Sequence, residues 1–426
     1  MTGKKLFKQL QKFDSELCEV LKFSLDRQIS TLSLIPTDNA ASPLSQYLKG
    51  SALGNDFIGH NALEHFSRIE QLAVKRACEI FQAEHAILRT GNPIAASRVV
   101  LMALAKSGEK ILSFNLRKSE HCTGEQMNYK FIKFAVEPHN LQINFEKLRY
   151  LALKNKPTLI IFSPVNYPKN IDYKNLKKIS DEIGAKLWID LGQNAGLVAA
   201  KKILSPVPYA DVVTFAGSDG LHGPQSGIIL CKKNLSKILE ETVIKTGHAS
   251  LKKNVMAALA ITFREIKCEE FLYYSEAVLE NARALEKGLQ KAGAEIFCSP
   301  TENHLVLVKM FDDGGKTVAN LEKAGLLVKA ENLLTSDDKI FYPILRLSSL
   351  DPTTRALSAE DMFKVGEILG EFLKSAQDAA AIKKVQKFVE KIVENLPLFS
   401  EDWLPEEEIY NDIDADLMVK TMIYGM

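Results

Sequence analysis

Short apolar runs alternate with amphipathic stretches through the first two thirds of the chain. Apolar residues at helical spacing cover residues 145–153 and 176–183, between such runs. Strand and helix in alternation predict an α/β fold with a mostly parallel sheet and helices on both faces. Ligands of such sheets bind at the carboxyl ends of the strands. The runs that we interpret as strands are KILSF, FIKFAV, TLIIFSP, KLWIDLG, DVVTFAG and GIILC.

The pattern divides the chain into four parts. Residues 1–30 carry apolar side chains at helical spacing, which predicts a helical arm that packs on a neighbouring subunit. Residues 31–265 form the large α/β domain, and residues 266–374 form a smaller α+β domain with strands AEIF, HLVLVKM and ILRLSS. Residues 375–426 form an added helical and acidic tail.

The tail has an apolar face that admits two interpretations. It either docks a protein partner or packs on the protein's own domain, and Phe399, Trp403 and Leu404 follow it as further anchors. The acidic and then apolar end of the chain is typical of a docking element or of a partly disordered segment. The face is formed by Ile382, Val385, Phe388, Val389, Ile392 and Val393.

Composition excludes several classes of partner. The 54 basic and 53 acidic residues nearly cancel, so no overall charge favours nucleic acid or an anionic membrane. No apolar run is long enough to span a bilayer. The six cysteines are scattered without the spacing of a disulfide framework or a zinc site, and the histidines give no metal-ligand set. A reducing compartment, the cytoplasm, fits best.

Two loops carry candidate functional or helix-capping residues. The apolar run in residues 210–227, ADVVTFAGSDGLHGPQSG, ends in small and turn-forming residues before a second run begins, which predicts two buried strands around a functional loop. The segment LSLIPTDNAASP is a loop leading to a helix, with Thr37, Asp38 and Asn39 as candidate N-caps.

Five colinear blocks resemble the serine hydroxymethyltransferase family of pyridoxal-phosphate enzymes. TLSLIPTDNAASP is similar to the family's TLELIASENFVSP, IDLGQNAGLVAA to VDMAHIAGLVAA, and ENHLVLV to DNHLLLV. PVPYADVVT is similar to the same segment in the family, and ILRLSSLDPTTRAL resembles IRIGTPALTTRGF. The resemblance implies fold type I, the fold of aspartate aminotransferase, and a homodimer or higher oligomer. One-carbon chemistry on serine and glycine is the activity it implies.

The resemblance fails at the residues that carry the family's chemistry. The lysine of TTTTHKTLRGP, which forms an imine with the cofactor, falls at Asp219, and the histidine before it falls at Ser218. A carboxylate cannot form an imine. The family's NKYAEGYPGKRYYGG is shortened to NDFIGHN, which places the catalytic glutamate at Gly59 and a tyrosine at Phe57. We therefore expect no catalytic residue at these positions.

Other positions keep the residue type that the resemblance implies for cofactor or substrate. Two interpretations stay open for them. They bind pyridoxal or pyridoxamine phosphate without a covalent bond, or they satisfy one another in a polar cleft. The implied roles are phosphate binding for Thr90 and Gly91, ring stacking for His121, the phenolic oxygen for Ser163, the pyridine nitrogen for Asp190, a histidine position held by Gln193, and the substrate carboxylate for Arg346.

The first hypothesis is a catalytically silent family member that acts through binding or assembly with itself, an active relative or another protein. The alternative is an enzyme that uses pyridoxal or pyridoxamine phosphate without an internal aldimine, with Asp219 as a candidate general base, or one that retains weak serine hydroxymethyltransferase activity.

Overall fold

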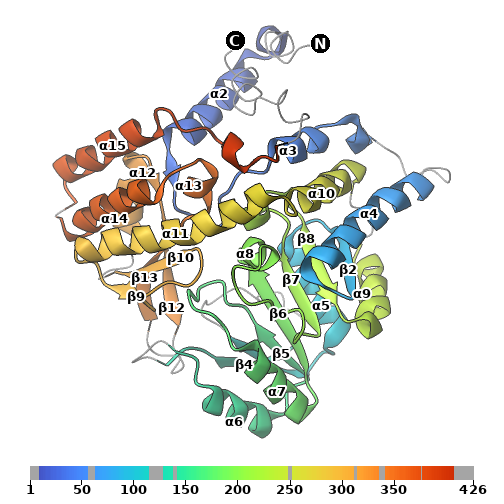
Figure 1. Ribbon diagram of the computed structural model, residues 1–426. Helices are drawn as coiled ribbons and strands as arrows, with labels where there is room; N and C mark the ends of the chain where they lie inside the picture. The colour runs from blue at the N-terminus through green and yellow to red at the C-terminus, as the bar shows by residue number, and fades with distance from the viewer. Residues whose placement is uncertain are drawn as a thin grey trace.

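Two sheets organise the chain in the computed structural model, and one long helix belongs to both of their cores. That helix, α11 (Glu269–Lys291), runs across the two parts (Figure 1). Its first half packs Tyr274 and Val278 into the core of the larger part, and its second half packs Leu285 and Leu289 into the core of the smaller part. The structure describes residues 9–55, 63–114, 128–137, 142–247, 252–310, 314–334, 341–375 and 377–406.

The larger sheet has seven strands in the order β2-β8-β7-β6-β5-β3-β4. The four pairings from β7 to β4 are parallel, whereas β8 runs antiparallel to both β7 and β2. All six predicted runs are strands of this sheet, and its mostly parallel direction is confirmed. The strands are β2 (His85–Thr90), β3 (Lys110–Phe114), β4 (Lys130–Phe134), β5 (Leu159–Phe162), β6 (Lys186–Gly192), β7 (Val212–Ala216) and β8 (Gly227–Cys231).

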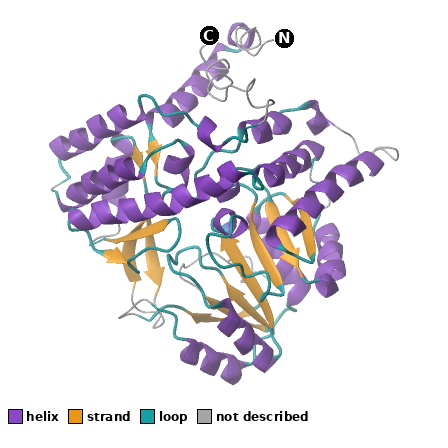
Figure 2. Cartoon of the chain, in the orientation of Figure 1, coloured by secondary structure: helices purple, strands orange, loops and turns teal. Residues whose placement is uncertain are grey.

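Helices cover both faces of this sheet, as its strand composition requires. Along β5 successive side chains point to opposite faces, so Ile160 and Phe162 join one core while Leu159 and Ile161 join the other. Figure 2 shows the strands lying between two groups of helices. One face carries α5 (Pro93–Leu104) and α9 (Lys233–Lys245). The other carries α4 (Leu63–Phe81), α6 (Phe145–Asn155), α7 (Tyr173–Ile183) and α10 (Lys253–Glu265).

The smaller sheet is antiparallel in the order β12-β13-β10-β9. It packs on α12 (Gly315–Lys323) and α14 (Ala359–Lys374), and the short parallel pair β1 (Leu32–Ser33) and β11 (Leu326–Leu327) joins the same core. The domain limits predicted at residues 30, 265 and 374 stay predictions. The strands are β9 (Ile296–Phe297), β10 (Leu305–Lys309), β12 (Lys329–Leu334) and β13 (Phe341–Ser348).

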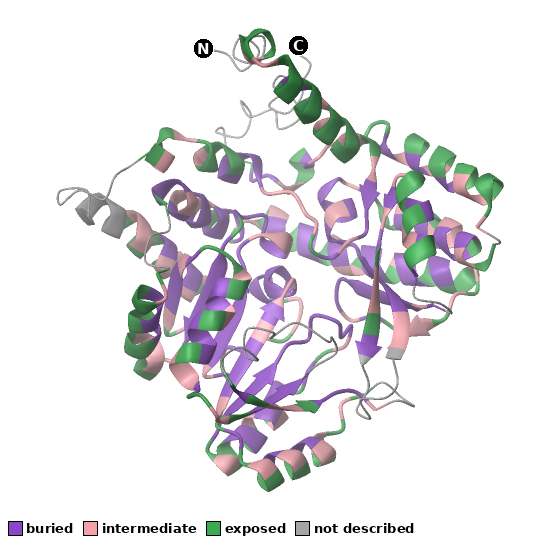
Figure 3. Ribbon diagram, turned by 180° about the vertical axis from the view of Figure 1, so that it is seen from behind, coloured by how far each residue is buried: buried purple, intermediate pink, exposed green. Residues whose placement is uncertain are grey.

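Helix α2 (Ser15–Ser30) projects from the body of the protein (Figures 1 and 3). Asp14 caps its first turn by accepting a hydrogen bond from the N–H of Leu17 at 2.9 Å. Several large apolar side chains on this arm face solvent, with Phe13 91% and Phe23 72% exposed. A helix is therefore present within residues 1–30 and carries exposed apolar side chains, while the arm as a separate part of the chain stays a prediction.

The predicted docking face of the tail is not free. Helix α15 (Ala379–Val393) buries Val385, Val389 and Val393 in the core of the smaller part, where half-buried Ile382 and Phe388 also pack. Of the two interpretations, packing on the protein's own domain describes this face, because the helix closes a core that α12 and α14 leave open. None of the described helices is long and apolar enough to cross a bilayer.

Candidate functional site

The predicted site residues come from the loops at the carboxyl edge of the larger sheet and from one strand of the smaller sheet. Ser163 follows β5, Asp190 lies in β6, Gln193 follows β6 and Asp219 follows β7. Arg346 reaches them from β13. Three predicted positions, Phe57, Gly59 and His121, lie outside the described residues.

Asp190 is held by three donors of its own surroundings. The hydroxyl groups of Ser163 and Thr214 and the N–H of Gly192 donate to its carboxylate, each at 3.3 Å. Thr214 in turn accepts a hydrogen bond from the indole N–H of Trp188 at 2.8 Å. Burial raises the pKa of Asp190, and these hydrogen bonds oppose the rise. The structure thus brings Ser163 and Asp190 together.

Arg346 is fully buried and surrounded by acceptors from the protein itself. Its Nη2 donates to the side-chain oxygen of Gln193 and to the carbonyl of Val165, both at 2.8 Å. The carboxylate of Glu331 lies 3.9 Å from Nη1. Glu331 is itself fixed by the amide of Asn166 at 3.1 Å. An internal carboxylate therefore balances the arginine that the resemblance assigns to a substrate carboxylate.

Gln193 joins Arg346 to Asp219. It accepts from the guanidinium and, through a second hydrogen bond, lowers the pKa of Asp219. The hydroxyl of Ser218 donates to the same carboxylate at 2.9 Å. Burial is the larger effect and raises the pKa of Asp219 to about 6, against the opposing influence of Ser218, Gln193 and Arg346. Asp219, Gln193, Arg346 and Glu331 form one connected group, which we call the internal polar network.

The backbone around Asp219 is strained and held by another segment. Asp219 and His222 both have positive φ, at 54° and 58°, and they bracket the short turn η3 (Asp219–Leu221). Each such residue costs on the order of 1–3 kcal/mol unless its surroundings fix it. The side-chain amide of Asn39 donates to the carbonyl of Asp219 at 2.7 Å. Asn39 therefore helps to hold the backbone of Asp219 in this conformation.

The N-cap prediction for the segment before α3 (Pro43–Lys49) is wrong. Ser42 is the cap, because its hydroxyl accepts from the N–H of Ser45 at 3.2 Å. Asn39 is instead used to hold the Asp219 loop, and Asp38 accepts from Ser33 at 2.8 Å. Asn39 and Asp38 therefore bond residues outside α3 and do not cap that helix.

The turn after β2 is a poor phosphate cradle in this chain. The hydroxyl of Thr90 donates to the carbonyl of Gly227 at 2.7 Å, across the β2–β8 pair. Helix α5 begins with Pro93, which has no N–H. The side-chain oxygen of Asn92 accepts a hydrogen bond from the N–H of Ala95 at 2.8 Å. Gly91 lies in open space. Fewer backbone donors are thus left at this helix N-terminus for an anion.

Pyridoxal phosphate, the group that the resemblance implies, does not fit these described residues as a covalently held cofactor. Position 219 offers a carboxylate and not an amine, and the carboxylate of Glu331 already lies 3.9 Å from the guanidinium of Arg346. The described residues contain no group of three metal-ligating side chains. Glu331, Asn166 and Asn39 contribute to the site without a recognisable signal in the sequence, because each acts through a contact between distant segments.

Comparison with known proteins supports the family resemblance and the fold that it implies. The model of the family described as "Serine hydroxymethyltransferase" matches residues 10–369. A serine hydroxymethyltransferase of Rhodopirellula baltica is 31% identical over 406 residues, which cover 91% of this chain and 97% of that protein. The chain therefore belongs to the serine hydroxymethyltransferase family, with its fold type I architecture.

Proposed function

We propose that this protein is a family member without glycine or serine hydroxymethyltransferase activity, and that it acts by binding or assembly. The internal polar network carries this proposal. Buried Arg346 already donates to Gln193 and has Glu331 3.9 Å away, so a substrate carboxylate would compete with an internal one. An aspartate beside it cannot supply the amine that imine chemistry needs.

The proposal is tested by turnover. The purified protein would be incubated with pyridoxal phosphate, serine and tetrahydrofolate, beside an active relative and the same relative with its imine lysine replaced. We expect a rate no higher than that of the lysine-replaced relative. A rate that rises above this control in proportion to protein concentration would overturn the proposal.

One observation favours a second candidate function. A carboxyl group with a pKa of about 6, next to an arginine, is suited to general base catalysis near neutral pH. Such an enzyme would hold pyridoxal or pyridoxamine phosphate without a covalent bond, with Asp219 as the base. Equilibrium dialysis against both compounds separates the two candidate functions. Saturable binding favours the second one if Asp219→Asn keeps the binding and abolishes turnover. If neither compound binds, the second candidate is removed.

The assembly part of the proposal is supported by the arm. Helix α2 exposes apolar side chains that a second copy of the chain would bury, as in a homodimer or a higher oligomer. Val20→Ser with Phe23→Ser should shift the protein to smaller species in analytical ultracentrifugation, whereas Tyr150→Ser, an equally exposed change on α6, should not. Identical sedimentation of all three proteins would refute the role of the arm.

Two further parts of the proposal rest on sequence alone. A protein partner reached through the tail would use residues after 406, which are acidic and then apolar, because the face of α15 is covered. The cytoplasm is the proposed compartment, since the scattered cysteines suit a reducing environment.

A further inference from the structure

Residues 397–406 lie across the loop that carries Asp219, although they are distant from it in the sequence. We call these residues the C-terminal strap. They follow α15, include the turn η4 (Glu401–Trp403), and lie beyond residue 369, where the match to the family model ends. Figure 1 shows the chain returning from α15 toward α3 and the N-terminal end of α11. The strap is thus an addition to the matched part of the fold.

The strap is fastened to the turn α13 (Leu350–Thr354) and to the residue after it. The N–H of Ser400 donates to the carbonyl of Thr354 at 2.8 Å, and the indole N–H of Trp403 donates to the carbonyl of Thr353 at 2.8 Å. From the other side, Arg355 donates to the carbonyl of Pro397 at 3.0 Å. Three hydrogen bonds therefore fix its backbone and its largest side chain.

Phe399 is the part of the strap that meets the Asp219 loop. Its ring is buried, with its centroid 4.9 Å from that of His222 in an edge-on arrangement. The other side of His222 packs on Tyr274 at 4.3 Å, and Trp403 packs on Tyr274 at 5.6 Å. His222 is thus held between the strap and α11, and burial lowers its pKa to about 3, which keeps the ring neutral.

From His222 a chain of contacts leads to Asp219. The Nε2 atom of His222 lies 3.0 Å from the hydroxyl of Thr354, which lies 2.6 Å from the side-chain oxygen of Asn39. Asn39 donates to the carbonyl of Asp219. The carbonyl of His222 also accepts from the N–H of Ser42 at 2.8 Å. Both strained residues of the loop are therefore tied to groups that the strap contacts.

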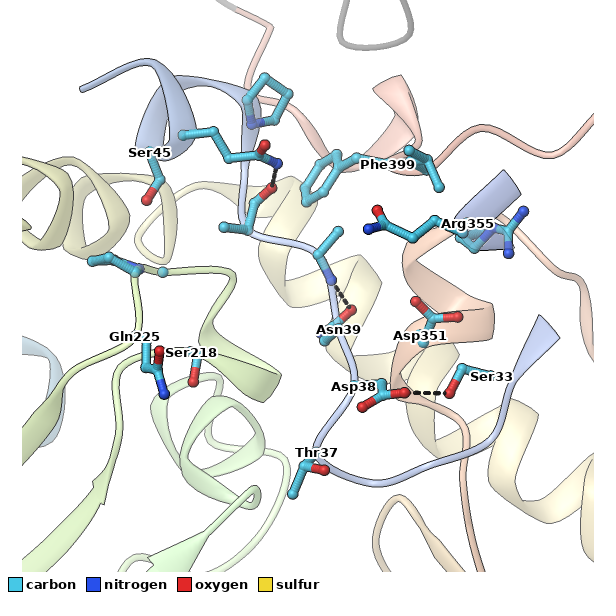
Figure 4. A pocket seen from close by; sticks show the side chains of 18 of the residues that line it. Ser33, Thr37, Asp38, Asn39, Ser45, Ser218, Gln225, Asp351, Arg355 and Phe399 are labelled. Atoms are coloured by element: carbon cyan, nitrogen blue, oxygen red, sulfur yellow. Dashed lines mark hydrogen bonds between the residues drawn. The ribbon is translucent and has the colours of Figure 1, made fainter. Parts of the chain in front are cut away.

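The strap also forms part of the wall of a cavity of about 680 Å³. Phe399 and Arg355 lie on one side of it, and Asn39 and Ser218 lie on the side of the Asp219 loop (Figure 4). Moving the strap would therefore change the cavity and the support of the loop together.

We propose that the C-terminal strap is an intramolecular clamp that holds the Asp219 loop in its strained conformation and closes one wall of the cavity. When the strap is released, His222 loses the ring of Phe399 and residues 216–226 open to solvent. The inference concerns the position of the loop and does not depend on whether the protein catalyses a reaction.

Amide hydrogen exchange on the full chain tests the clamp. Phe399→Ala removes the ring beside His222, so peptides covering residues 38–46 and 216–226 should exchange faster by about tenfold or more. Phe388→Ala is the matched control, because that half-buried ring lies on α15 in the other core. It should leave both peptides unchanged. Phe399→Leu keeps an apolar side chain and should give a smaller increase in the same peptides.

The outcome separates a clamp from general destabilisation. Faster exchange confined to the two named peptides supports the inference. If Phe399→Ala does not fold, the same result in Phe399→Leu is sufficient. Unchanged exchange in the Phe399 variants, or an equal increase in Phe388→Ala, overturns it. Neither result bears on the turnover assay, so the clamp and the proposed loss of activity stand or fall separately.

Discussion

Asp219→Asn should stabilise the protein at alkaline pH and leave it unchanged at acidic pH. Burial raises the pKa of Asp219 from 3.8 to about 6, so the folded protein favours the neutral carboxyl group. The stability that this preference contributes is present below pH 3.8 and is lost as pH rises through about 6. Above that pH the ionised form costs up to about 3 kcal/mol, at 1.36 kcal/mol per pKa unit. This shift in the pKa of Asp219 already includes the favourable influence of Arg346.

Asparagine removes this cost while keeping the local contacts. Its oxygen can accept from Ser218, and asparagine tolerates the positive φ of this position. Urea unfolding followed through the buried Trp188 at several pH values should show the variant more stable by about 2–3 kcal/mol at pH 8, with the difference vanishing near pH 4. Asp181→Asn, on the exposed face of α7, controls for net charge. A less stable variant at pH 8, or a difference independent of pH, would refute the reasoning.

Four further substitutions probe the internal polar network and the contacts of Arg355. Glu331→Gln should destabilise the protein by about 2–4 kcal/mol in urea unfolding, because it removes the carboxylate that lies near the buried charge of Arg346. Its control is Lys329→Met, which removes an exposed partner of Glu331 and should cost less than about 1 kcal/mol. Equal losses of stability in the two variants would count against the internal polar network. Asp219→Lys should lower the melting temperature and restore no serine cleavage, since the new ammonium group would face Arg346; recovered turnover would show that the lysine alone was missing. Arg355→Met should destabilise by about 2–4 kcal/mol, because its guanidinium bonds the carbonyls of Ile29, Thr31 and Pro397, and a change below about 0.5 kcal/mol would contradict that role.

The larger sheet could be predicted because its strands are short, continuous apolar runs. In β5 every residue is buried on one face or the other, so a run such as LIIF has few alternatives to a central strand. The direction of β8 could not be predicted, since an antiparallel strand buried on both faces has the same composition. The arm and the helix of the tail were predicted from periodicity, but periodicity cannot say what covers an apolar face.

The polar site was predictable only by resemblance, and its internal contacts were not predictable at all. Glu331 meets Arg346 because β12 and β13 pair in a register that sets Lys329 opposite Arg346, which leaves Glu331 on the diagonal. Nothing in the sequence around either residue states this register. Asn39 and Asp219 are likewise 180 residues apart. The first contact depends on strand register and the second on how two distant loops meet, and neither can be recognised from the local sequence.

We propose that the protein's own charges occupy the site, so that it does not hold pyridoxal phosphate through an imine. Borohydride reduction of the protein with limiting pyridoxal phosphate, followed by peptide mapping, tests it most directly. We expect only scattered, non-saturable labelling of exposed lysines and no change in labelling on adding serine. A stoichiometric adduct at one lysine, saturable in cofactor and displaced by serine, would contradict it.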